Sequence, residues 1–137
     1  MLFASLNYLA VIAAAVASFV FGGIWYSALS KHWVDATGHE PAAFKDSFGL
    51  YAITFAAQLV MAWTLAAVLL HLARGGVVMG ARAGLLAALA IWFGFVVTTM
   101  SVNYAYHGAR PKLTLIDGAH WLGVLLIQGA VLGLWGA

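Results

Sequence analysis

Four apolar runs, each long enough for a membrane-spanning helix, constrain this chain more than any other feature of its sequence. They cover about residues 7–29, 48–72, 83–106 and 115–135, and none has a Lys, Arg, Asp or Glu near its middle. A helix needs about 20 mostly apolar residues to cross a bilayer. Lipid offers no partners to backbone polar groups, and the alternating pattern of barrel strands is absent. The sequence therefore predicts an all-α protein, an integral membrane bundle of four transmembrane helices.

The composition also indicates that lipid surrounds the chain. Of its 137 residues, 65% are hydrophobic and only 7% are charged, whereas a soluble domain has about 25% charged residues. We expect a single domain, 1–137, in contact with membrane lipids. The net charge of +2 is too small and too scattered for a nucleic-acid-binding surface, so we predict no nucleic-acid partner. The absence of cysteine excludes disulfides, thiol catalysis and Cys-based metal sites.

The connections between the runs indicate local structure. The start of the first connection, 31–37, has the composition of a short interfacial helix that ends at Gly38. Thr114 and Asp117 have the spacing of a capping box, so we expect the fourth helix to begin there. These features place the polar segments at the ends of the predicted spans.

The charges of the connections suggest an orientation. Four spans place both termini on one side of the membrane and the first and third connections on the other. The side of the first and third connections has more basic residues, Lys31, Lys45, Arg110 and Lys112, than the opposite side, Arg74 and Arg82. The positive-inside rule then predicts that both termini lie outside.

Small and polar residues inside the runs predict how the helices pack. Helices in lipid associate where small residues let their backbones approach. Such residues recur at intervals of four in the first and fourth runs, at Ala10, Ala14, Ser18 and Gly22 and at Gly129 and Gly133. We expect close packing along these stripes, within one chain or between copies, and predict a homo-oligomer. Gln58 and Gln128 lie well inside their runs, and either could bridge helices.

Most polar side chains with useful chemistry lie around the third connection. Thr99, Asn103 and His107 are four apart and share one helix face, and Asp117 and His120 lie one turn apart. We predict a polar recess at one membrane face for a small or lipid-like ligand, formed by Thr99, Asn103, Tyr106, His107, Arg110, Asp117 and His120 and closed by Trp25, Tyr26 and the stretch up to Trp33. The alternative is that these groups only bond to their own helices or lock helices together, while the aromatic residues anchor the helices at the interface.

The sequence contains no known catalytic signature. It lacks a nucleophile and base at a recognisable spacing, a phosphate-binding loop and a dinucleotide fingerprint. His32, Asp35 and His39 have helical spacing that suits a divalent metal, and the histidines also suit a pH-responsive cluster. We nevertheless expect no metal and no cofactor. A binding or transport module is the leading hypothesis, ahead of an accessory subunit of a larger membrane complex and an intramembrane enzyme.

Several short stretches resemble an uncharacterised bacterial membrane protein family, the domain of unknown function 1761. The resemblance rests on residues 7–11 (NYLAV), 23–27 (GIWYS), Trp33, 94–96 (GFV), Thr98, Thr99, Asn103, Gly108, Arg110, 113–118 (LTLIDG), 129–133 (GAVLG) and Trp135. Family members often have Pro where this chain has Ala28, so the first helix is expected to run on. The resemblance implies a multi-pass protein of the bacterial cytoplasmic membrane, with no established activity and no catalytic residues.

Overall fold

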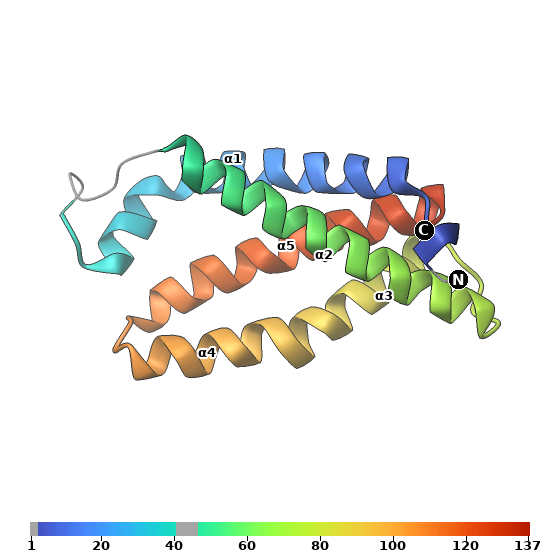
Figure 1. Ribbon diagram of the computed structural model, residues 1–137. Coiled ribbons are helices and arrows are strands. Elements are labelled where there is room, and N and C mark those ends of the chain that lie inside the picture. Colours follow the sequence, from blue (N-terminus) through green and yellow to red (C-terminus); the bar gives the residue numbers. More distant parts are fainter. Residues whose placement is uncertain (1–2, 41–46) are drawn as a thin grey trace.

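The computed structural model describes residues 3–40 and 47–137, and these residues form helices and no strand (Figure 1). The elements in chain order are η1 (Phe3–Ser5), α1 (Tyr8–Thr37), α2 (Phe48–Arg74), α3 (Ala81–Ile91), the π-helical turn η3 (Trp92–Val96), α4 (Val97–Tyr106) and α5 (Pro111–Trp135). The α3–η3–α4 series is one continuous helical stretch. With α1, α2 and α5 it gives four helices long and apolar enough to cross a membrane, which confirms the predicted fold class. Lys45, which contributed to the charge count, lies outside the described residues.

The first helix is longer than the predicted span. Asn7 caps its start, where the side chain accepts a hydrogen bond of 3.1 Å from the backbone N–H of Ala10. Gly38 caps its end at a φ of 72°, a left-handed conformation that glycine adopts at little cost. The predicted interfacial segment, 31–37, is therefore the last part of α1 and not a separate helix. In Figure 1 this end of α1 turns towards the connection between α4 and α5.

The prediction that the fourth helix begins at a capping box formed by Thr114 and Asp117 is wrong. The helix begins at Pro111, and Arg110 is its extended N-cap residue. Proline suits this position because its fixed φ matches a helix and its missing N–H would have no partner in the first turn. Asp117 consequently lies roughly 9 Å along α5, at about 1.5 Å per residue. It is a residue of the helix interior and not of the helix mouth.

The last helix, α5, is central and packs against α1, α2 and α3. Small residues make its closest contacts. A Cβ at Gly84 of α3 would overlap the carbonyl oxygen of Gly129, and one at Gly133 would overlap the carbonyl oxygen of Gly80. On α1 the predicted stripe is buried in full, at Ala10, Ala14, Ser18 and Gly22. The large apolar residues of α1 instead point outwards, at Leu9, Ile12, Val16, Val20 and Ile24.

The π-helical turn changes which face of the third span meets α5. The backbone N–H of Val97 bonds to the carbonyl of Trp92, five residues earlier, so this turn holds one residue more than an α-helical turn. The extra residue rotates the following helix relative to α3. After the turn, Val97 lies against Gly118 and Tyr104 reaches α5. No residue of η3 or α4 is buried, so this half of the third span lies at the edge of the bundle.

Candidate functional site

The most unusual polar group in the bundle is the carboxylate of Asp117, which is only 7% exposed. Three aromatic side chains donate hydrogen bonds to it. The Tyr26 hydroxyl and the Trp33 indole N–H, both from α1, donate to Oδ1 at 2.8 Å and 3.0 Å. The Tyr104 hydroxyl from α4 donates to Oδ2 at 2.8 Å. The carboxylate therefore joins three separate helices through its two oxygens.

No cation balances this carboxylate among residues 3–40 and 47–137. The ion pair found there joins Lys112 to Asp35, and all three donors to Asp117 are neutral groups. A buried charge without a partner of opposite sign costs several kcal/mol (roughly 3–5 when a pair is broken). Ionisable residues within membrane-spanning helices usually mark a functional site for this reason. Asp117 is therefore the first candidate for a functional residue.

A pocket of about 480 Å³ lies directly beside the Asp117 cluster. Two of the three donors to the carboxylate, Trp33 and Tyr104, form part of its wall. The other lining residues come from the end of α1, the connection into α5 and the first turn of α5, and they are Thr37, Gly38, His39, His107, Gly108, Ala109, Arg110 and Leu113. The volume lies within the range of about 300–1,000 Å³ typical of small-molecule sites. The pocket thus combines an aromatic wall with basic and imidazole groups.

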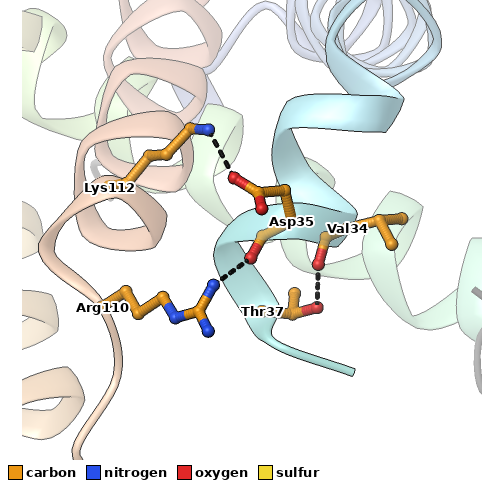
Figure 2. Close-up of polar contacts among 5 residues, drawn as sticks. All are labelled: Val34, Asp35, Thr37, Arg110 and Lys112. Atoms are coloured by element: carbon orange, nitrogen blue, oxygen red, sulfur yellow. Dashed lines mark hydrogen bonds and ion pairs between the residues drawn. The ribbon is translucent and has the colours of Figure 1, made fainter. Parts of the chain in front are cut away.

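The rim of this pocket is held by contacts between α1 and the start of α5 (Figure 2). The Arg110 guanidinium donates to the backbone carbonyl of Asp35 at 2.7 Å, which gives a partner to one of the last carbonyls of α1. The Lys112 ammonium pairs with the Asp35 carboxylate at 2.7 Å. Both side chains of the pair are largely exposed, so this pair positions the helix end more than it stabilises the fold.

The polar groups continue deeper into the bundle. His120 is 3% exposed, and its ring packs on that of Tyr26 at a centroid distance of 4.7 Å. Gly22 provides the room for this ring, because a Cβ there would lie 2.9 Å from His120 Nε2. One polar atom of this ring, Nδ1, has no hydrogen-bond partner among the described residues.

A second polar cluster, formed by Ser18, Gln58 and Gln128, is fully buried between α1, α2 and α5. The Ser18 hydroxyl donates to Gln58 Oε1 at 2.8 Å, and Gln128 Nε2 donates to Ser18 Oγ and to the Gln58 carbonyl, each at 3.0 Å. These bonds confirm the prediction that the glutamines could bridge helices, and both do so. Gln58 Nε2 and Gln128 Oε1 lack partners within the described part of the chain, so the cluster is only partly satisfied.

Comparison with protein families gives a match over most of the chain. The family described as "Protein of unknown function (DUF1761)" matches residues 9–133, which is nearly the whole chain. The chain belongs to this family. The matched range contains Asp117, its three donors and all the residues that line the pocket. Neither the curated proteins nor the solved structures include a significant match to the chain.

Within this member of the family, the structure brings together only part of the predicted recess. Asp117 and Tyr26 are bonded to each other, His120 packs on Tyr26, and His107 and Arg110 line the pocket. Four other predicted residues lie elsewhere. Thr99 and Asn103 are exposed, Thr99 donates to the carbonyl of Phe95, Tyr106 is 89% exposed, and Trp25 packs on Phe21. The Trp25 indole N–H is buried and finds no acceptor among the described residues.

Sequence reasoning missed two hydrogen bonds at the centre of the site. Trp33 is expected only as part of the stretch that closes the recess, and Tyr104 is not among the predicted recess residues, but both donate to Asp117. The signal that could have found them is chemical, because a buried carboxylate needs donors and aromatic N–H and O–H groups at the same membrane level can supply them. Leu113, Thr37 and Gly38 also line the pocket without an earlier indication of that role.

The proposed metal ligands do not come together as a site. His32, Asp35 and His39 are all exposed. Across the residues that the structure describes, no group of three or more His, Cys, Asp or Glu side chains is placed to hold a metal ion. Asp35 is instead paired with Lys112.

Proposed function

We propose that this protein is a small ligand-binding module of the bacterial cytoplasmic membrane, and that the pocket beside Asp117 is its site. One observation carries the proposal. The two aromatic side chains that form the pocket wall, Trp33 and Tyr104, are also two of the three side chains that donate hydrogen bonds to the buried carboxylate. A ligand that contacts this wall therefore acts on the group that joins α1, α4 and α5. Such coupling between a pocket and helix packing is what a binding or transport module requires.

The position of the pocket supports an amphiphilic ligand. It opens where α1 ends and α5 begins, beside a connection that contains His107, Gly108 and Arg110. Its wall also includes Leu113 and the ring of Trp33, which suit apolar parts of a ligand. A molecule with a polar head and an apolar body would match both kinds of lining.

The test uses two leucines in the first turns of α5. Leu113 lines the pocket, whereas Leu115 is 72% exposed and points away from the bundle. Leu113→Trp should fill the pocket, and Leu115→Trp adds the same ring outside it. Each protein is released into lipid nanodiscs and its mass is measured by native mass spectrometry. We expect a reproducible extra mass on the unmodified protein and on Leu115→Trp, and its loss from Leu113→Trp. Retention of that mass by Leu113→Trp would refute the pocket as the site.

A second candidate function is a non-catalytic subunit that associates through the third span, with itself or within a larger membrane complex. The observation that favours it is the exposure of η3 and α4, which have no buried residue and which present Phe93 and Phe95 outwards. The same mass spectra distinguish this candidate. A complex without any added small molecule, or one that contains another protein, would favour the subunit role over ligand binding.

A further inference from the structure

We infer that the pocket is selective for a zwitterionic headgroup, with the cationic group against Trp33 and Tyr104 and the anionic group on Arg110. The inference rests on the proposed function and names the chemistry of the ligand. Phosphocholine and phosphoethanolamine groups have this chemistry, either as lipid headgroups or as free molecules in water.

The aromatic wall favours the cationic group. Trp33 and Tyr104 line the pocket, and each donates a hydrogen bond to the carboxylate of Asp117, at 3.0 Å from the indole nitrogen and 2.8 Å from the phenol oxygen. Aromatic rings attract ammonium groups through their negative faces, most strongly where water is excluded. The buried carboxylate of Asp117 also attracts a cation. A quaternary or primary ammonium at this wall would supply the positive charge that Asp117 lacks within the described residues.

Arg110, another residue of the lining, favours the anionic group. The Arg110 guanidinium uses Nη1 to bond the Asp35 carbonyl, and its Nη2 faces Gly38, where a Cβ would stand 3.5 Å away. A guanidinium has five N–H donors. The bond to α1 therefore fixes the group in place and leaves further donors for a phosphate or carboxylate, which arginine binds through paired hydrogen bonds. His107 lies in the same lining and can add a donor.

The charges around the pocket also disfavour ligands with a single charge. Lys112 and Asp35 neutralise each other at 2.7 Å. Among the charged residues of the described chain that line the pocket or bond to its lining, Arg110 and Asp117 then remain, with opposite signs. An anion alone would approach the Asp117 carboxylate, and a cation alone would approach Arg110. A zwitterion pairs with both groups, so specificity comes from rejection of singly charged ligands as well as from attraction.

The test compares headgroups on one alkyl chain. The protein is placed in nanodiscs of phosphatidylglycerol, whose headgroup has no amine, and titrated by calorimetry with dodecylphosphocholine, dodecyl phosphate, dodecyltrimethylammonium and dodecyl maltoside, each below its micelle concentration. Empty nanodiscs give the background for partitioning into lipid. We expect dodecylphosphocholine to bind saturably and about tenfold more tightly than either singly charged probe, as one added charge contact predicts.

Two variants then test each end of the site separately. Asp117→Asn should remove the preference for dodecylphosphocholine over dodecyl phosphate, and Arg110→Gln should remove the preference over dodecyltrimethylammonium. Arg82→Gln is the control, because it removes an exposed basic group at the start of α3 that does not line the pocket. If Asp117→Asn fails to fold, the four probes on the unmodified protein still decide the question.

The outcomes separate the inference from the proposed function. If a singly charged or neutral probe binds as tightly as dodecylphosphocholine or more tightly, the inference of a zwitterionic ligand is refuted. The proposal of a ligand pocket would still stand. No saturable binding of any probe would overturn both. Free phosphocholine identifies the source of the ligand, since comparable binding without the alkyl chain indicates a water-soluble zwitterion and loss of binding indicates a lipid. Either of these two results supports the inference.

Discussion

The contact between α3 and α5 leads to a sharp prediction about stability, since two helix backbones meet there without side chains between them. The perturbation is Gly84→Ala. A Cβ at this position would overlap the carbonyl oxygen of Gly129 and would lie 2.7 Å from its carbonyl carbon and 3.3 Å from the Cα of Gly133. All three are backbone atoms of α5, so no rotamer change can relieve the overlap. The two helices must move apart instead.

The size of the effect follows from two opposing contributions. Overpacking a well-packed contact costs about 1–3 kcal/mol, and a rigid backbone places this site near the upper value. Alanine also stabilises a helix by about 1 kcal/mol relative to glycine. We therefore expect Gly84→Ala to lower the free energy of unfolding by about 2 kcal/mol, as the difference of these two contributions. The matched control is Gly94→Ala in the same span, where an added Cβ has no neighbouring atom within 4 Å.

The assay is the free energy of unfolding in lipid bicelles, followed by circular dichroism or by steric trapping. Gly94→Ala should be neutral or stabilised by up to about 1 kcal/mol, which makes the difference between the two variants about 2–3 kcal/mol. If the two variants unfold within about 0.5 kcal/mol of each other, the normal range for surface substitutions, the close backbone contact between α3 and α5 is refuted.

Three further predictions concern polar contacts. Gln128→Leu should lower the free energy of unfolding by about 1 kcal/mol, because it removes two bonds between helices in the bundle interior, and the unfolding midpoint in detergent checks this. Trp92→Phe should cost about 1 kcal/mol in the same assay, since it removes the 2.8 Å bond to the Gly118 carbonyl beside the π-helical turn. Lys112→Gln should leave the midpoint unchanged because its pair with Asp35 is exposed, and a clear loss of stability would contradict this weak role.

The sequence was sufficient to predict the four helices and the buried stripe of α1. A segment that crosses lipid must pair every backbone polar group within the protein, and a helix of about 20 mostly apolar residues meets this requirement. Such a run is therefore a clear signal in the sequence. The stripe from Ala10 to Gly22 is also strongly constrained, because small residues are needed wherever helices touch. The helix ends were less predictable. The start of α5 depended on whether Pro111 or Thr114 began the first turn, and the two signals lie within one turn of each other.

The face of the third span that meets α5 was not predictable from the regular period of an α-helix. A straight α-helix continued from Gly84 and Ala88 would carry Thr99 and Asn103 towards α5. The π-helical turn holds one extra residue, so the face towards α5 moves forward by one position and carries Tyr104 instead. No local residue pattern required this turn. The turn is bonded to the neighbouring helix, since Trp92 donates to the Gly118 carbonyl of α5.

The π-helical turn is therefore the feature that connects the fold to the candidate site. It brings Tyr104 to the carboxylate of Asp117 and, by the same rotation, leaves Asn103 on the exposed side. The carboxylate can remain buried because Tyr104 adds a third hydrogen-bond donor to the two that α1 supplies. Single π-helical turns inside α-helices are rare and occur frequently at functional sites. An arrangement that only locked helices together would need neither the irregular turn nor a charged acceptor, because a neutral amide would accept the same hydrogen bonds at a lower desolvation cost.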